Sequence, residues 1–314
     1  MDIFLKLKNL DRRWVYLCVA LSVILPMIFK YELEMKPSTA VKGIYDKIES
    51  LPEGSRVFLS FDFDPAAEPE LGPGAIAIFV HMFRRNIKPV IGCNWPLGSQ
   101  LAEDCLKKAK IIHEQNYNNA TLRKEGKISK SSKFKLEPGI DYVNLGYKPG
   151  GIIHVKNLCN DFMGTYPQDM TGKSTLNMDI FTKNIKGKKF SIEDIDLIIS
   201  YTAGTNGIEA FIQVEADHKR PMAAGCTSVN IPRFTTYLQT GQLVGMIGGL
   251  PGSAEYETLV GDYGSDKDGK PIIAEGRAGM FPQAVAHLAI MLFIILGNLA
   301  YIAENRKLGK KKKA

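Results

Sequence analysis

Two uncharged apolar segments lie near the two ends of the sequence, at residues 14–29 and 278–303. A membrane hydrocarbon core of about 30 Å requires about 20 apolar residues in a helix. The second segment exceeds that length. The first is slightly shorter, but its neighbours Arg13 and Lys30 have long side chains that can reach the membrane surface. The pattern therefore predicts two transmembrane helices, at residues 14–30 and 278–303.

Four residues within these segments refine the prediction. Pro26 is expected to kink the first helix or to end it early, whereas Pro282 suits the first turn of the second. A cleaved signal peptide is the alternative for the first segment, but no small-residue cleavage site closely follows it, so an uncleaved anchor is favoured. His287 and Asn298 are polar side chains inside the second segment, and they indicate contact with another membrane helix or a proton or ion relay.

Between these segments, short apolar runs alternate with helical periodicity. Five runs are typical of buried strands: Arg56–Asp62, Lys88–Cys93, 141–145, 196–200 and 221–226. Helices are predicted at 70–86, 97–112, 208–218 and 232–245. Strands that alternate with helices at this spacing predict βαβ units with right-handed crossovers. The expected fold is α/β, a Rossmann-like three-layer sandwich with a mostly parallel sheet, flanked by N- and C-terminal transmembrane helices.

Two segments of the middle region lack this alternation. Residues 116–135 are polar and basic, and residues 161–190 show little periodicity of either kind. Surface loops are expected in both places, and the first is expected to be mobile. Long loops in a compact domain are often functional, so each is also a place where a partner can dock. The basic loop offers a patch for lipid headgroups or an acidic partner as the sharper alternative.

The net charge of +7 and the isoelectric point of about 9.0 come from the two ends of the sequence. Residues 1–13 carry a net charge of +2 and residues 304–314 a net charge of +5, while the remaining charges cancel. A nucleic-acid partner is therefore not expected. Because basic residues beside membrane spans favour the cytoplasmic side, we expect both basic ends in the cytoplasm. The α/β domain, residues 31–277, is then extracytoplasmic.

Polar residues follow each predicted strand, and in an open parallel sheet ligands bind beyond the carboxyl ends of the strands. The candidate ligand-binding residues at this edge are Asn94, Trp95, Thr202, Gly204, Thr205, Asn206, Thr227 and Ser228. Tyr147 and Lys148 follow the third predicted strand at the same edge. The sequence therefore predicts a polar rim that can form a pocket for a small ligand.

Asp62 and Asp64 are the candidate catalytic or metal-binding pair. They stand two residues apart at the end of the first predicted strand, so both side chains are expected on one side. Such a pair can bind Mg²⁺ or divide the roles of nucleophile and acid. The alternative is a strand-end turn, or favourable negative charge at the start of the next helix.

The run of residues 57–64, VFLSFDFD, resembles the first motif of the haloacid-dehalogenase-like hydrolases, an apolar strand that ends in D-x-D. Residue types that this family uses later in the chain occur in the same order, as Ser200 or Thr202, Lys219 and residues 261–266 (GDYGSD). The residues directly after the second aspartate, Pro65 and Ala66, depart from the family pattern. The resemblance implies a phosphohydrolase that uses the aspartate pair with Mg²⁺ as cofactor.

Glycines and cysteines in the middle region favour packing roles. Gly245 and Gly249 are four residues apart in an apolar stretch, so two backbones can approach closely there. This indicates a subunit interface, or packing of a helix on the domain's own sheet. Cys93 and Cys226 end apolar strands and are expected in the core, and a disulfide between them stays open. The five histidines show no zinc-binding spacing.

These observations favour a membrane-anchored, non-catalytic subunit or scaffold that uses a Rossmann-like domain for protein or small-ligand contacts. Its expected partners are the lipid bilayer and either further copies of the chain or other membrane subunits. The candidate interface residues are Gly245, Gly249, His287 and Asn298. No cofactor is required by this hypothesis. The alternatives are an Mg²⁺-dependent phosphohydrolase that uses Asp62 and Asp64, and a ligand-binding sensory domain.

Overall fold

The computed structural model describes residues 11–183, 189–204, 207–215, 220–266 and 268–311. The chain divides into an α/β domain, Glu34–Gly276, and a second unit that joins Met1–Leu33 to Arg277–Ala314. The domain contains a six-stranded sheet in the order β3-β2-β1-β4-β5-β6, with every neighbouring pair parallel. The strands are β1 Arg56–Asp62, β2 Lys88–Cys93, β3 Val143–Tyr147, β4 Leu197–Thr202, β5 Met222–Cys226 and β6 Gly245–Gly248.

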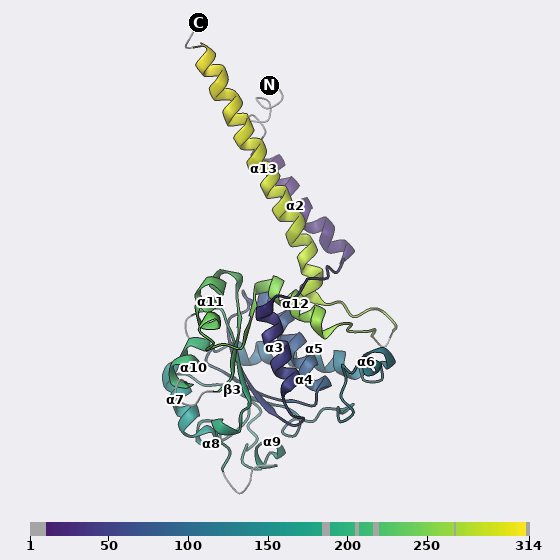
Figure 1. Ribbon diagram of the computed structural model, residues 1–314, viewed down its shortest axis with the longest axis vertical. Coiled ribbons are helices and arrows are strands. Elements are labelled where there is room, and N and C mark those ends of the chain that lie inside the picture. The colour runs from purple at the N-terminus through teal and green to yellow at the C-terminus, as the bar shows by residue number, and fades with distance from the viewer. Residues whose placement is uncertain (1–10, 184–188, 205–206, 216–219, 267, 312–314) are drawn as a thin grey trace. The chain divides into compact units, whose positions relative to one another are not determined.

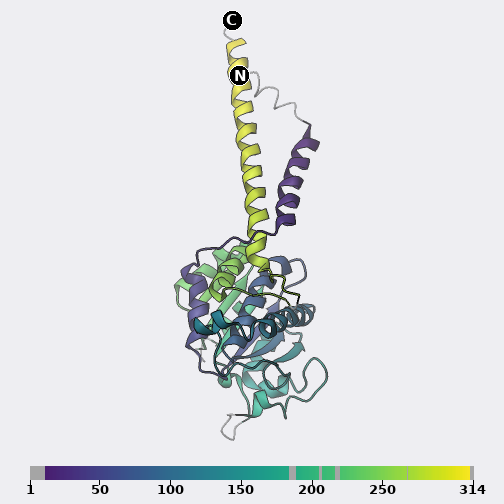
Figure 2. The same ribbon diagram turned by 90° about the vertical axis from the view of Figure 1, so that its right-hand side faces the viewer.

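Helices cover both faces of this sheet (Figure 1). One face is covered by α3 Thr39–Ser50, α4 Glu68–Arg84, α5 Gly98–Asn116 and α12 Gly249–Val260. Figure 2 turns this side toward the viewer. The other face is covered by α7 Ile152–Asn160, α8 Phe162–Thr165, α9 Asp179–Thr182, α10 Ile208–Glu215 and α11 Ile231–Gln239. The predicted Rossmann-like three-layer α/β fold is therefore confirmed.

Two hydrophobic cores separate the three layers. Successive strand residues point to opposite faces of a sheet, and in β1 the side chains of Val57, Leu59 and Phe61 enter one core while Phe58 enters the other. All seven residues of β1 are buried, as expected for a central strand covered on both faces. Its bounds and those of β2 match the predicted runs, and the next three strands are shifted by at most two residues.

The sixth strand corrects the predicted helix over residues 232–245. Helix α11 ends at Gln239, Gly241 adopts a φ of 75°, and the chain then enters β6 at Gly245. A Cβ atom on Gly245 would lie 2.5 Å from the carbonyl oxygen of Ala40, so only glycine allows this strand to lie against α3. Gly249 is buried at the start of α12 with a φ of 59°. A close approach of two backbones thus occurs at Gly245, inside the domain and between a strand and a helix, whereas the nearest neighbours of Gly249 are the side chains of Ser228 and Glu70.

The segment of residues 116–135, predicted as a loop, contains secondary structure and is bonded to the domain. Asn119 caps the short helix α6, Ala120–Lys124, by accepting from two backbone amides. Further along, the backbone amide of Ser129 donates to the carbonyl oxygen of Arg84, and the Ser132 hydroxyl donates to that of Phe83. Residues 161–190 include α8 and α9 and are otherwise irregular over their described part, as expected. The short helix η1 spans Ile192–Asp194.

The second unit contains two helices, α2 Arg12–Phe29 and α13 Glu275–Lys311, the latter beginning in the last residues of the domain. Both are long and apolar enough to span a membrane, over Arg12–Phe29 and Glu275–Ile302, with little of their surface buried. Pro26 does not end α2 early, because the helix continues to Phe29. After α2, the backbone amide of Leu33 donates to the carbonyl oxygen of Arg277 at 3.1 Å.

The cysteines in the sheet behave as predicted core residues. Cys93 and Cys226 end β2 and β5, and both are fully buried free thiols, so they form no disulfide with each other. Burial raises the pKa of each thiol, and neither is therefore a nucleophile at neutral pH.

Candidate functional site

The parallel strands bring their polar ends to one edge of the sheet, as the sequence predicted. Asp62 is the last residue of β1, and Asn94 directly follows β2. Thr202 was predicted to follow the fourth strand but is the last residue of β4. It lies opposite Asp62 in the register of β1 and β4. Thr205 and Asn206 lie outside the described residues. The edge formed by the carboxyl ends of the strands is called the rim below.

Asp62 is buried at the centre of the rim, with only 5% of its surface exposed. Its Oδ2 atom accepts hydrogen bonds from the hydroxyls of Ser60, at 2.6 Å, and Ser200, at 3.3 Å. Its Oδ1 atom accepts from the backbone amide of Asn94 at 2.7 Å. Burial raises the pKa of Asp62 to about 6, and these hydrogen bonds oppose the rise. The side chain is therefore mainly an ionised carboxylate at pH 7, with both oxygens engaged by the protein.

Asp64 does not share this environment. It is partly exposed in the turn before α4, where its Oδ1 atom accepts from the backbone amide of Ala66 at 3.0 Å. Asp64 thus stabilises the turn after β1, whereas Asp62 is buried at the end of the strand. Across the residues that the structure describes, no group of three or more His, Cys, Asp or Glu side chains is arranged to hold a metal ion.

The parts that resemble a haloacid-dehalogenase-like site are only partly brought together. Ser200 contacts Asp62, and Lys219 lies outside the described residues. Helix α4 starts after β1 at the rim and runs back to the opposite edge of the sheet, where its last residue, Arg84, donates to the carbonyl oxygen of Asp262 at 2.9 Å. The length of α4 therefore separates the GDYGSD run from Asp62.

His154 was missed as a site residue by sequence reasoning, although it contacts the rim directly. It lies in the first turn of α7 and is 4% exposed. Its Nδ1 atom is hydrogen-bonded to Oδ1 of Asn94. Because an amide oxygen only accepts, Nδ1 carries the proton and Nε2 keeps its lone pair. Nε2 is buried and has no hydrogen-bond partner among the described residues.

A glycine turn places His154 at this position. Gly150 and Gly151 link β3 to α7 with φ values of 130° and 53°, which side-chain-bearing residues rarely adopt. The backbone amide of Lys148, just before this turn, donates to the carbonyl oxygen of Cys93 and extends the pairing of β3 with β2. The run K-P-G-G after a predicted strand is the local signal that marks this part of the rim.

A polar pocket of about 440 Å³ opens beside His154. It is lined by Lys148, Pro149, His154, Asn157, Asn160, Asp161, Gly164 and Thr165. Burial, and secondarily the charge of Lys148, lowers the pKa of His154 to about 4, so the imidazole is neutral at pH 7. Asp161 forms an ion pair with Lys189 at 2.6 Å, which lowers the pKa of this carboxyl. The pocket is therefore lined by the ammonium of Lys148, the carboxylate of Asp161 in its ion pair, amide groups, a hydroxyl and the neutral imidazole of His154.

The remaining predicted rim residues make contacts within the protein. Thr202 Oγ1 accepts from the backbone amide of Gly204 at 3.3 Å. After β5, the short helix η2, Ser228–Asn230, is bonded to α4, because Ser228 donates from its backbone amide and hydroxyl to Glu70 Oε2. Thr227 Oγ1 accepts from the side-chain amide of Asn230. The β4–β5 part of the rim is thus held by internal bonds, and the pocket lies beside β2 and β3.

Trp95 stands apart from these contacts. Its side chain is 39% exposed, and its carbonyl oxygen accepts from the backbone amide of Gly98 at the start of α5. A Cβ atom on Gly98 would collide with the carbonyl oxygen of Phe61, so α5 begins in direct contact with the backbone of β1. Glycine at this position allows the helix to start close to the rim.

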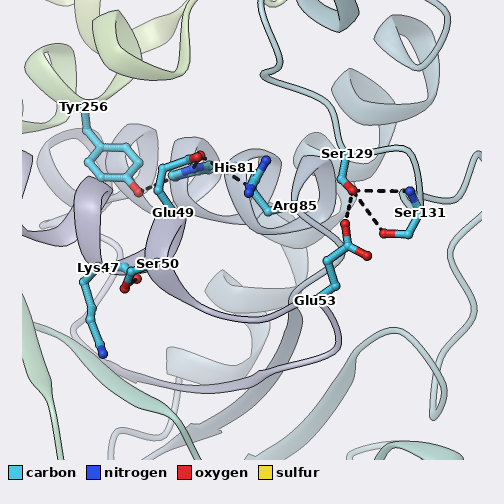
Figure 3. A network of polar contacts seen from close by, with 9 residues as sticks. All are labelled: Lys47, Glu49, Ser50, Glu53, His81, Arg85, Ser129, Ser131 and Tyr256. Carbon is cyan, nitrogen blue, oxygen red and sulfur yellow. Dashed lines mark hydrogen bonds and ion pairs between the residues drawn. The ribbon is translucent and has the colours of Figure 1, made fainter.

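A second buried polar network lies between α3, α4 and α12 (Figure 3). His81 contacts Glu49 Oε1 through Nε2, at 2.7 Å, and the Tyr256 hydroxyl through Nδ1, at 2.8 Å. Tyr45 stacks on the imidazole with ring centroids 4.4 Å apart. Both ring nitrogens of His81 have protein partners, whereas at His154 only Nδ1 has one among the described residues. The network therefore joins three helices and leaves no nitrogen for a ligand.

Comparison of this chain with protein-family models, with curated proteins and with solved structures finds no match.

Proposed function

We propose that this chain is a membrane-anchored, non-catalytic domain that binds a small polar ligand in the pocket beside His154. The observation that carries the proposal is a polar pocket lined in part by His154, whose buried Nε2 atom has no hydrogen-bond partner among the described residues. Leaving a buried polar atom without a partner costs about 1–3 kcal/mol, so such an atom indicates a bound molecule that completes it.

The pocket chemistry favours a small anion that carries hydroxyl groups. Lys148 supplies positive charge, and the side-chain amides of Asn157 and Asn160 can donate and accept hydrogen bonds. The Thr165 hydroxyl donates to the carbonyl oxygen of Asp161, so it can only accept from a ligand. The bare Nε2 atom of His154 accepts, so it suits a ligand hydroxyl rather than a carboxylate or phosphate oxygen. Sugar phosphates and sugar acids combine these features.

Binding rather than phosphoryl transfer is favoured by the state of Asp62. Both of its oxygens accept hydrogen bonds from the protein, and the carboxylate is almost completely buried. A nucleophile must reach the reacting atom of its substrate. Asp62 is instead suited to orient Asn94, because it accepts from the backbone amide of that residue. The side-chain oxygen of Asn94, Oδ1, in turn sets the tautomer of His154. This role requires no Mg²⁺.

Membrane anchoring is the second part of the proposal. It is supported by the length and apolar character of α2 and α13. Positive charge at residues 1–13 and 304–314 favours the cytoplasm for both, which makes the α/β domain extracytoplasmic. In this arrangement the pocket samples molecules outside the cytoplasm, as in the sensory alternative.

A thermal-shift screen of the detergent-solubilised chain tests the proposal. The panel contains glucose 6-phosphate, glycerol 3-phosphate, gluconate and, as neutral references, glucose and glycerol. A hydroxylated anion is expected to raise Tm by mass action, and the rise is expected to disappear in Lys148→Gln. Lys156→Gln is the matched control, because Lys156 is exposed on α7, the helix of His154, and does not line the pocket. A shift of equal size in Lys148→Gln, or none with any anion, would contradict the proposal.

A further inference from the structure

Helix α13 has two sides of different exposure along its apolar part. Ala289, Phe293 and Leu296 are partly buried, and Ala300 is 3% exposed. The opposite side, called the outer stripe below, carries exposed residues at helical spacing: His287, Met291, Ile294 and Asn298. His287 and Asn298 therefore both belong to the more exposed side of this segment.

The two polar residues lie in line on this helix. Asn298 lies eleven positions after His287, which is close to three turns of an α-helix with 3.6 residues each. Their side chains therefore project in nearly the same direction, about 16 Å apart along the axis. A single flat partner surface can contact both.

In a bilayer the outer stripe requires a partner. Lipid tails offer no hydrogen bonds, and a polar group left unpaired in hydrocarbon is strongly disfavoured. The four residues of the outer stripe are exposed, so the described part of this chain does not cover them. A partner from another chain can therefore reach them.

A second copy of the same helix matches this stripe without further assumptions. The amide of Asn298 donates and accepts hydrogen bonds, and an imidazole can also donate and accept through its two ring nitrogens. In a parallel symmetric pair, each residue meets its own counterpart at the same depth, so both polar positions are satisfied together. An unrelated helix would need complementary groups at the same separation.

We propose that the chain forms a parallel homodimer through the outer stripe of α13, with Asn298 opposite Asn298 and His287 opposite His287 of the second copy. The proposal goes beyond ligand binding and does not depend on the pocket. Met291 and Ile294, which are 50% and 57% exposed, then form the apolar contacts between the two polar pairs.

Disulfide cross-linking of the purified full chain in lipid vesicles tests this. The background replaces Cys18 and Cys159 by alanine, because the other cysteines are buried. Ile294→Cys places a thiol on the outer stripe, and Phe293→Cys places one on the opposite side as the matched control. With copper phenanthroline as oxidant, covalent dimers are expected from Ile294→Cys and not from Phe293→Cys. Equal cross-linking of both, or of neither, would overturn the proposal.

A substitution of Asn298 distinguishes a specific dimer from cross-linking by random encounters between monomers. Asn298→Leu, combined with Ile294→Cys, is expected to weaken dimerisation about three- to tenfold, the range expected for one hydrogen bond between membrane helices. Asn298→Gln retains both hydrogen-bonding groups and is expected to restore cross-linking. Near-ultraviolet circular dichroism verifies that each variant keeps the folded domain. Undiminished cross-linking in a folded Asn298→Leu variant would contradict the role of Asn298.

Discussion

Nδ1 of His154 is hydrogen-bonded to the side-chain carbonyl oxygen of Asn94, across 60 positions of sequence and between α7 and the end of β2. This bond links the pocket to the buried carboxylate of Asp62, which accepts from the Asn94 backbone amide. The three residues form a series of hydrogen bonds from the centre of the sheet to the pocket wall. The pKa values of Asp62 and His154 are shifted strongly, so measurements of stability against pH can test this arrangement.

The pKa of Asp62 gives the first expected pH effect. Burial raises this pKa from 3.8 to about 6, so between these pH values the folded state holds a proton that the unfolded state releases. Asp62 therefore lowers stability progressively as pH rises through this window, by at most about 3 kcal/mol. Asp62→Asn removes the effect. Its free energy of unfolding relative to wild type is expected to rise between pH 4.5 and 7, as measured by denaturant titration.

The pKa of His154 gives an effect of opposite sign. Burial lowers this pKa from 6.5 to about 4, so on acidification the unfolded state binds a proton before the folded state does. His154 therefore lowers stability as pH falls from 6.5 toward 4, again by at most about 3 kcal/mol. His154→Gln is expected to lose less stability than wild type over this range. Parallel pH profiles for the two proteins would show that His154 is not buried as described.

Gly245 provides a test of the sixth strand. In Gly245→Ala the new Cβ atom meets the backbone of α3, at 2.5 Å from the Ala40 carbonyl oxygen and 2.6 Å from the Ile44 nitrogen. Backbone atoms cannot move aside independently, so a loss of about 1–3 kcal/mol in unfolding free energy is expected. Gly204→Ala is the matched control, because nothing lies within 4 Å of its added Cβ atom. Equal stability of the two variants would argue against this packing.

Membrane topology is tested by labelling an introduced thiol. Lys130 is exposed on the α/β domain, and Lys130→Cys in the background without Cys18 and Cys159 provides one accessible site. A membrane-impermeant maleimide is expected to label it in intact cells, because the proposed topology, based on the positive charge at both ends, has the domain outside the cytoplasm. Labelling only after the membrane is broken would reverse the proposed topology.

The layers of the fold were predictable because they follow from local patterns. The runs Arg56–Asp62 and Lys88–Cys93 are mostly apolar and are bounded by polar residues. The sequence therefore predicted where each of these two strands begins and ends. The strand at Gly245–Gly248 was missed because two of its four residues are glycines and its apolar core is only Met246 and Ile247. Its conformation depends on contact with α3, about 200 positions earlier, which no local pattern contains.

The site was predictable only in part, for a related reason. The rule that ligands bind beyond strand ends identified Asp62 and Asn94, because it depends on sheet geometry alone. It did not identify His154, which reaches the rim from a helix after a glycine turn. The expected partnership of Asp62 with Asp64 depended on strand alternation continuing past Asp62, but β1 ends there and the chain turns.

The most direct test of the account is calorimetric titration of the chain with glucose 6-phosphate, in wild type, His154→Gln and Lys156→Gln. The ligand is expected to bind wild type and Lys156→Gln with equal affinity. Loss of the Nε2 acceptor is expected to weaken binding by about tenfold or more, since one hydrogen bond to a buried group contributes about 1.4 kcal/mol or more. Equal binding to His154→Gln, or no binding to wild type, would contradict the claim that this pocket and its free imidazole nitrogen form a ligand site.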